Sequence, residues 1–181
     1  MPRKNNFFVI TGGPGSGKST LIGALSARGY ETTEEVGRRI IQEQQTVGGK
    51  ALPWADKALF AELMLSWEMR SYRDKMGSRN VVFFDRGVPD VVGYLELEDI
   101  PVPCHASRAA QTLLYAPRVF LCPPWPEIFG QDAERKQTLE VAARTYDTMV
   151  RTYGALGYEL VEVPRATVDE RADFVIRMAE R

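Results

Sequence analysis

The sequence predicts an α/β protein with three layers, in which a parallel sheet of roughly five strands carries helices on both faces. Short apolar segments recur along the chain, and helical segments separate them. Several of these segments are continuously apolar, which is typical of parallel strands that are buried on both faces. The expected strands are residues 7–11, 30–33, 81–84, 118–122 and 158–163.

The first part of the chain predicts two strand–helix units. Residues 7–11 are apolar and are followed by two glycines. A helix is expected over 18–28, because Gly29 then marks its end. The segment 30–33 predicts a short, weak strand, and 34–45 the helix that follows it.

The middle of the chain predicts a longer helix and the third strand. The helix covers 54–75, with one apolar stripe at helical spacing formed by Phe60, Leu63, Met64 and Trp67. The strand 81–84 is wholly apolar and ends on Asp85. Since ligands bind at the carboxyl ends of strands in open α/β sheets, we expect Asp85 and the glycines after the first strand to share one crevice.

The last part of the chain predicts two strands, a long helix between them and a final helix. The long helix is indicated by apolar residues at helical spacing: Leu139, Ala142, Ala143, Tyr146, Met149, Val150 and Tyr153. The final helix starts at Thr167, because Glu170 completes a capping box with it.

Length and composition indicate a single domain over residues 1–181, with 44% apolar and 26% charged residues. The net charge of −1 makes a nucleic-acid partner unlikely. Cys104 and Cys122 match no metal-binding or CxxC spacing. The apolar run near the N-terminus is too short for a signal peptide, and no segment reaches transmembrane length, so we expect a cytoplasmic protein with no membrane association.

The segment Gly12–Ser19 matches the P-loop, or Walker A, pattern in every fixed position, with a strand before it and a helix after it. This predicts the three-layer P-loop NTPase fold and binding of a nucleoside triphosphate. Backbone amides and the helix dipole would hold the phosphates. Lys18 would reach the β- and γ-phosphates, and the Ser19 hydroxyl would bind Mg²⁺. The expected nucleotide-binding residues are Gly13, Pro14, Gly15, Ser16, Gly17, Lys18, Ser19 and Thr20.

The Asp85-Arg86 pair is the second candidate for chemistry. Asp85 can hold Mg²⁺ together with Ser19, or it can accept a proton from an attacking hydroxyl group, and Arg86 can neutralise phosphate charge. The structural alternative is an aspartate that caps the next helix beside a solvated arginine. Guanine-specific, switch-type and transporter-type motifs are absent from the sequence, which favours a small phosphotransferase.

With these motifs, the chain resembles the nucleoside and nucleotide kinases, which carry Asp-Arg or Glu-Arg after the third strand. It is also similar to the small AAA-domain P-loop ATPases related to the nicotinamide riboside kinase domain of the bacterial NAD regulator. That group pairs the P-loop with Glu-x-x-Arg, matched here by Glu35 and Arg38, and has a lid like "WPEIFGQDAERKQ". The resemblance implies ATP binding and suggests kinase activity.

Two further segments complete the expected site. Residues 34–80 form an acceptor-side helical segment, in which Glu35 and Arg38 share a helix face and would bind the acceptor; a plain surface ion pair is the alternative. Residues 123–140 form a lid, from which Arg135 would stabilise the transferring group; an ordinary solvated turn is the alternative.

Three functions remain open from the sequence. The first is a kinase that uses ATP and Mg²⁺ to phosphorylate a small acceptor such as a nucleoside or nucleotide, with Lys18, Asp85, Arg86 and Arg135 as catalytic residues. The second is an ATPase or nucleotide-dependent switch that acts with a protein or RNA partner. The third is a phosphatase that uses water as the acceptor of the phosphoryl group.

Overall fold

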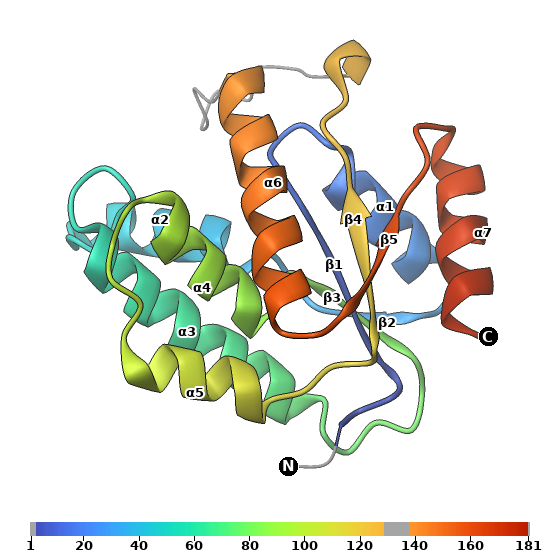
Figure 1. Ribbon diagram of the computed structural model, residues 1–181, viewed down its shortest axis with the longest axis horizontal. Coiled ribbons are helices and arrows are strands. Elements are labelled where there is room, and N and C mark those ends of the chain that lie inside the picture. The colour runs from blue at the N-terminus through green and yellow to red at the C-terminus, as the bar shows by residue number, and fades with distance from the viewer. Residues whose placement is uncertain (1–2, 129–137, 181) are drawn as a thin grey trace.

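The computed structural model describes residues 3–128 and 138–180 and has a five-stranded, wholly parallel sheet at its centre (Figure 1). The strand order is β2-β3-β1-β4-β5, and each of the four strand pairs is parallel. The predicted α/β fold with about five parallel strands is therefore confirmed. The strands are β1 (Phe7–Gly12), β2 (Glu31–Thr32), β3 (Val82–Asp85), β4 (Arg118–Cys122) and β5 (Glu159–Glu162).

Seven α-helices and one short 3₁₀ helix connect these strands in the described part of the chain. They are α1 (Lys18–Ala27), α2 (Val36–Val47), α3 (Lys57–Asp74), α4 (Val88–Leu97), α5 (Cys104–Thr112), the 3₁₀ helix η1 (Pro126–Ile128), α6 (Leu139–Ala155) and α7 (Val168–Ala179). The sequence predicted five of the α-helices and missed α4 and α5. Most residues of α4 are buried, between α3 and α6, so its apolar residues form no single stripe. Helix α5 has only nine residues.

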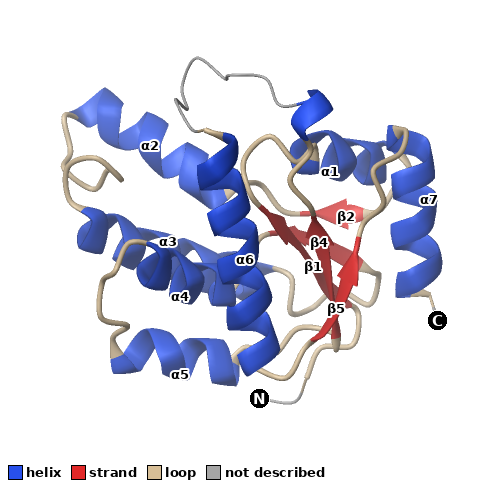
Figure 2. Cartoon of the chain, turned by 45° about the horizontal axis from the view of Figure 1, so that its top comes forward, coloured by secondary structure: helices blue, strands red, loops and turns tan. Residues whose placement is uncertain are grey.

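The helices form a layer on each face of the sheet, as the sequence predicted (Figure 2). Helices α1 and α7 cover one face, where their apolar residues pack on Phe8, Ile10, Phe83 and Phe120. Helices α3, α4, α5 and α6 cover the opposite face. Helix α2 packs outside α3 through Val36, Ile40 and Phe60, and so leaves its N-terminus at the edge of the sheet.

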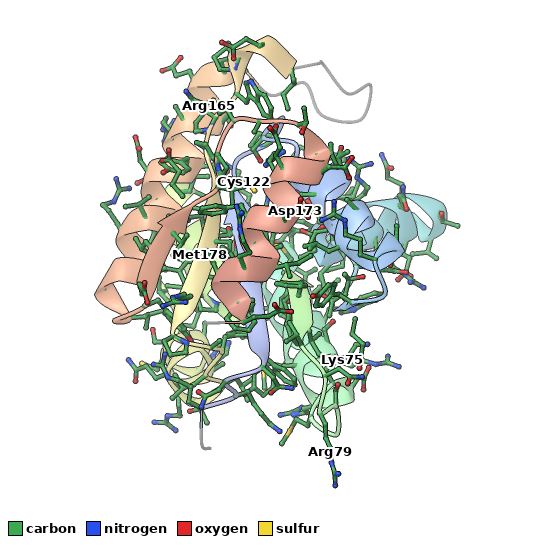
Figure 3. All side chains as sticks on the ribbon, turned by 90° about the vertical axis from the view of Figure 1, so that its right-hand side faces the viewer. Lys75, Arg79, Cys122, Arg165, Asp173 and Met178 are labelled. Atoms are coloured by element: carbon green, nitrogen blue, oxygen red, sulfur yellow. The ribbon has the colours of Figure 1, made fainter. Side chains whose placement is uncertain are left out.

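Polar contacts hold α7 against α1 and the sheet. Figure 3 views the molecule from the side of α7, with Asp173 and Met178 on this helix and Cys122 behind it. Arg28, at the end of α1, donates a hydrogen bond of 2.7 Å to Asp173. Arg118 donates one of 2.7 Å to the carbonyl oxygen of Met178. These contacts fix α7 beside the loop that joins β1 to α1.

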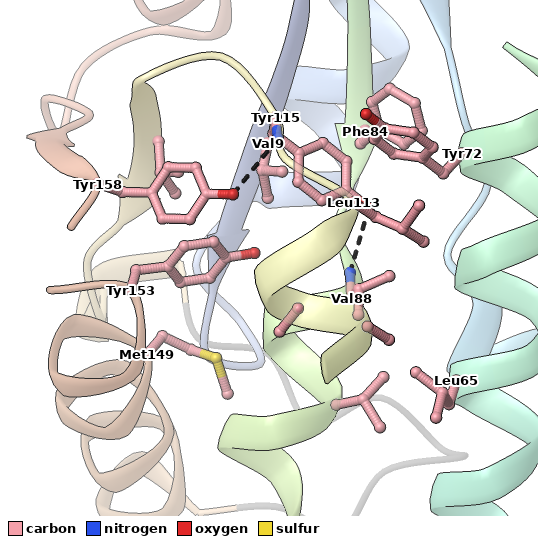
Figure 4. Packing of buried hydrophobic residues seen from close by; sticks show 14 of the residues in the cluster. Val9, Leu65, Tyr72, Phe84, Val88, Leu113, Tyr115, Met149, Tyr153 and Tyr158 are labelled. Carbon is pink, nitrogen blue, oxygen red and sulfur yellow. Dashed lines mark hydrogen bonds between the residues drawn. The ribbon is translucent and has the colours of Figure 1, made fainter. Parts of the chain in front are cut away.

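On the opposite face, tyrosine hydroxyl groups connect the core to the start of α4 (Figure 4). The hydroxyl of Tyr115 accepts a hydrogen bond of 3.2 Å from the amide of Val88, and that of Tyr158 accepts one of 3.3 Å from the amide of Tyr115. Burial raises the pKa of Tyr115 well above its usual value, so this hydroxyl stays neutral. Because Val88 begins α4, this chain of contacts positions the turn that contains Asp85 and Arg86.

Candidate active site

The loop between β1 and α1 has the backbone of a phosphate cradle. Gly15 and Gly17 have φ angles of 69° and 70°, in the left-handed region where glycine is unstrained. The hydroxyl of Ser16 donates a hydrogen bond of 2.8 Å to the carbonyl oxygen of Gly13 and closes the loop on itself. Helix α1 begins at Lys18 without a side-chain cap, so its first amide groups face the loop, as anion binding requires.

Lys18 and Asp85 meet at the carboxyl ends of the central strands. The ammonium group of Lys18 contacts a carboxylate oxygen of Asp85, and the two residues are 5% and 3% exposed. Strand register explains the meeting, because Asp85 lies beside Ile10 in the β1–β3 pair. The hydroxyl of Thr33 accepts a hydrogen bond of 3.0 Å from the Asp85 amide. The cradle and the strand-terminal carboxylate thus share one crevice.

Ser19, Asp85, Glu35 and Arg38 line a single pocket with a volume of about 590 Å³. Oxygen ligands suit Mg²⁺, which usually takes only one or two from protein and the rest from phosphates and water. The Ser19 hydroxyl and the Asp85 carboxylate match that requirement. No cluster of three or more His, Cys, Asp or Glu side chains that could hold a metal occurs among the described residues.

Arg86 follows Asp85 directly and lies close to Glu35, which lines this crevice. Its φ of 74° is unusual for a residue with a side chain, and its amide donates a hydrogen bond of 3.1 Å to the carbonyl oxygen of Ile10. Its Nη1 lies 3.2 Å from Asp90 Oδ1, and its Nε lies 3.7 Å from Glu35 Oε1. Burial alone would lower the pKa of Arg86, but the carboxylates of Asp90, Glu35 and Asp85 raise it overall, so the guanidinium stays charged.

Glu35 and Arg38 adjoin this arginine at the start of α2. Glu35 is the N-terminal cap residue of α2, and its carboxylate lies 3.9 Å from Arg38 Nε as well as close to Arg86. The structure therefore brings Glu35, Arg38 and Arg86 together, and the binding of an acceptor by Glu35 and Arg38 stays a prediction. Both Glu35 and Arg38 make polar contacts within the protein, so the pair is also part of the local ion network.

The lid residues divide into a described and an undescribed part. Arg135 lies outside the described residues, as does half of the predicted lid over 123–140. The described start of this segment contains Trp125 and η1. The centroid of the Trp125 ring lies 5.4 Å from Cζ of Arg171, so the guanidinium group stacks over the ring. The role of Arg135 stays a prediction.

Asp90 is a buried residue that the sequence analysis did not select. It accepts hydrogen bonds from the hydroxyl of Thr11, from Arg86, from the Gly87 amide at 3.0 Å and from the Tyr153 hydroxyl at 2.6 Å. These donors come from β1, from the turn after β3 and from α6. Asp90 therefore fixes the position of Arg86; its place three residues after Gly87, at the start of a helix, was the available signal.

Arg171, on α7, is the second residue that sequence reasoning missed. It is 2% exposed and donates hydrogen bonds to the carbonyl oxygens of Ser16 and Gly17, at 3.0 and 3.2 Å, and to Cys122 Sγ at 3.3 Å. A Cβ atom on Gly17 would lie 2.5 Å from Arg171 Nη1, so Gly17 leaves room for this guanidinium. Burial raises the pKa of the Cys122 thiol to about 11, which keeps it unreactive.

Comparison with known proteins places this architecture in a family. A model of an AAA-domain family matches residues 7–171. The chain belongs to this family. None of the curated proteins matches it.

Solved structures share the fold of this AAA-domain protein. Deoxyadenosine kinase from M. mycoides, with the products dCMP and a flexible dCDP bound, aligns with a TM-score of 0.67 and 16% identity over 96% of this chain and 98% of that one. The same kinase with bound dATP aligns with a TM-score of 0.58 and 14% identity, over 97% and 100% of the two chains. The NadR protein in complex with NR aligns with a TM-score of 0.68 and 16% identity, over 95% of this chain and 50% of that one.

At these identities the similarity shows a shared P-loop kinase-type fold. No helix in the described ranges is both long and apolar enough to cross a membrane.

Proposed function

We propose that this AAA-domain protein is a kinase that transfers the γ-phosphoryl group of ATP to a hydroxyl or phosphate group of a small acceptor, such as a nucleoside or nucleotide. The observation that carries the proposal is the contact between Lys18 and Asp85 at the edge of a pocket that Ser19, Glu35 and Arg38 also line. The kinase fold of deoxyadenosine kinase supports the same reading. These residues would supply a phosphate-binding group, a metal pair and an ion network for the acceptor within one crevice.

Each group has a defined role in this proposal. The backbone N–H groups of residues 13 and 15–20 bind the phosphates of ATP, and Lys18 binds the β- and γ-phosphates. Ser19 and Asp85 would hold Mg²⁺, which when bound offsets the negative charge of the phosphates. Arg86, with Arg135 from the lid, would stabilise charge on the group in transfer.

The transfer step balances without any further reactant. An acceptor oxygen forms a bond to the γ-phosphorus while the bond between that phosphorus and the β–γ bridging oxygen breaks, which releases ADP. When the acceptor is a hydroxyl group, its proton passes to the carboxylate of Asp85. Glu35, beside Arg86, orients the acceptor by accepting a hydrogen bond from a second polar group of the acceptor, since the reacting hydroxyl gives its one proton to Asp85.

A screen for acceptor-dependent ADP release tests the proposal. Purified protein with ATP and Mg²⁺ is incubated with nucleosides, nucleotides, sugars and vitamins, and ADP and phosphorylated product are measured together. We expect one acceptor class to raise ADP release, with product formed in equal amount. Lys18→Ala provides the control, with activity lower by about 10²-fold or more. Slow ADP release that no acceptor changes would contradict the proposal, and stimulation by a protein or RNA partner would favour a switch instead.

A further inference from the structure

A separate pocket of about 150 Å³ opens on the acceptor side of Arg86, enclosed by α2, α3, α4 and α6. We call it the helical pocket. Its apolar surface comes from residues on all four helices, and its polar lining includes Arg86 and Asp90 as well as Glu98, which lies near Tyr94. Lining residues that matter here are Phe60, Met64, Glu68, Tyr94, Arg86 and Asp90.

The helical pocket has one end near the transfer site and another end lined by aromatic rings. Phe60, Met64 and Glu68 follow one another at intervals of four residues, so they form one stripe on α3 about 12 Å long. The Glu68 end lies toward the transfer site, because the charges of Asp90, Asp85, Arg86 and Lys18 act on its carboxyl group. At the other end, the rings of Phe60 and Tyr94 pack edge to face, with centroids 5.5 Å apart.

Glu68 is a polar group available to a ligand in this pocket. It is 3% exposed, and no described residue forms a hydrogen bond or ion pair with it. Burial, reinforced by the nearby negative charges of Asp90 and Asp85, raises its pKa well above the usual value, so the carboxyl group is protonated and can donate a hydrogen bond.

Tyr94 offers a second polar group in the same pocket. Its buried hydroxyl has no hydrogen-bond partner among the residues that the structure describes. Buried polar groups normally have partners, because an unpaired one costs free energy. Glu68 on α3 and the Tyr94 hydroxyl on α4 both line this pocket, which points to a ligand with hydrogen-bonding atoms on an otherwise apolar body.

Resting on the proposed kinase function, we propose that the helical pocket binds the base of the acceptor, and that the acceptor is a nucleoside with an uncharged, single-ring base. A volume of about 150 Å³ is close to that of an apolar cavity that holds benzene, so it suits one six-membered ring. The Phe60 and Tyr94 rings contact the base, and Glu68 and the Tyr94 hydroxyl bond its polar edge. The sugar hydroxyl then faces Asp85.

Charge separates a nucleoside from a nucleotide in this pocket. Three carboxylates, those of Glu35, Asp90 and Glu98, line it with only one cationic side chain, that of Arg86, among the described lining residues. Arg86 is already bonded to Asp90 and close to Glu35. A 5′-phosphate would take the place of the hydroxyl group that faces the Asp85 carboxylate, and the like charges would repel each other, so nucleoside monophosphates should bind more weakly.

Calorimetric titration of the whole chain without ATP tests this inference. Thymidine, deoxycytidine and uridine are compared with their 5′-monophosphates, with adenosine and guanosine, and with nicotinamide riboside, whose ring is cationic. We expect at least one pyrimidine nucleoside to bind about tenfold or more tighter than every other class. Equal or tighter binding of purine nucleosides, monophosphates or nicotinamide riboside, or no binding by any pyrimidine nucleoside, would overturn it.

Variants connect the result to the pocket. Glu68→Gln keeps a neutral donor and acceptor and should bind within about threefold of the native protein, whereas Glu68→Met and Tyr94→Phe should each bind about tenfold more weakly. Glu62→Gln, on the exposed side of α3, is the matched control. Unchanged affinity in Tyr94→Phe and in a folded Glu68→Met variant would contradict the assignment. Since ATP is absent, a protein that binds these nucleosides but never phosphorylates them would contradict the kinase proposal alone.

Discussion

Arg171 Nη2 donates a hydrogen bond of 3.0 Å to the backbone carbonyl oxygen of Ser16, and so joins α7 to the phosphate loop. The same guanidinium bonds the carbonyl oxygen of Gly17. The N–H and C=O groups of a peptide point in opposite directions, so carbonyl groups held toward α7 leave the loop amides directed away from it. Arg171 thereby supports the loop conformation that anion binding needs.

Replacing Arg171 by methionine should lower the free energy of unfolding by about 2–4 kcal/mol, because buried carbonyl groups of the loop lose a charged partner. Urea denaturation measures the change. Arg177→Met, at an exposed position on the same helix, is the control and should change stability by less than about 0.5 kcal/mol. Equal stability of the two variants would show that Arg171 does not hold the loop.

Gly13→Ala and Gly154→Ala form a matched pair of substitutions, because an added methyl group is crowded at Gly13 and has open space at Gly154. A Cβ atom on Gly13 would lie 2.4 Å from the carbonyl oxygen of Ala142, whereas one on Gly154 meets nothing within 4 Å. We expect Gly13→Ala to destabilise the protein by about 1–3 kcal/mol through forced displacement of the loop. Gly154→Ala should stabilise it by up to about 1 kcal/mol, since alanine favours a helix interior. Thermal unfolding measures both variants. Shifts in melting temperature of the same sign for the two variants would refute the packing argument.

Asp90→Asn should destabilise the protein by about 2–4 kcal/mol, because an amide NH₂ group would face donors where the carboxylate now accepts hydrogen bonds from Tyr153 and Gly87. Chemical denaturation provides the measurement. Asp99→Asn is the control, since Asp99 is exposed and its φ of 55° is tolerated by asparagine as well as by aspartate. A loss below about 1 kcal/mol for Asp90→Asn would mean that the buried network does not depend on its charge.

Glu31 should give the fold a pH-dependent contact. The Glu31 carboxylate accepts hydrogen bonds from Ser78 at 2.7 Å and from Lys75 at 2.9 Å, and a further one from Asn80. These bonds outweigh the opposing effect of partial burial and lower the pKa of Glu31 to about 2. A lowered folded-state pKa stabilises the protein above the unfolded value near 4.5, and this contribution is lost as the pH falls toward 2.

Denaturation at a series of pH values measures that contribution. Glu31→Gln should be about 1 kcal/mol less stable than the native protein at pH 7, in the range of partly exposed ion pairs, and this difference should shrink as the pH falls from about 5 toward 3. Lys75→Met removes one hydrogen-bond partner of Glu31. Its loss of stability relative to the native protein should also shrink as the pH falls, and it should be smaller than that of Glu31→Gln. A difference that stays constant over this range would exclude the carboxylate as its source.

The three central strands, β1, β3 and β4, could be predicted from the sequence because they are short and almost continuously apolar. The capping box of α7 was also predictable, and it is present: Thr167 Oγ1 accepts from the Glu170 amide, and Glu170 Oε2 accepts from the Thr167 amide at 3.0 Å. Helix α4 could not be found in the same way, because its apolar residues serve contacts on several sides rather than one face.

The candidate site also contains residues that local sequence patterns reveal and residues that only tertiary packing reveals. The P-loop and the Asp85-Arg86 pair are local patterns, so the sequence showed them directly. Arg171 could not be selected, because it reaches Ser16 across 155 positions and its helix looks like an ordinary amphipathic one. Glu68 lies within an apolar stripe of α3, and only the packing of four helices shows that it faces a pocket.

Titration calorimetry of ATP, with millimolar Mg²⁺ and with a chelator in its place, tests the central claim most directly. The account predicts that the native protein binds ATP about tenfold or more tightly with Mg²⁺ than without it, and that Asp85→Asn loses this gain, because Asp85 and Ser19 would hold the metal beside the phosphates. No detectable ATP binding at millimolar Mg²⁺, or an undiminished Mg²⁺ effect in Asp85→Asn, would contradict it.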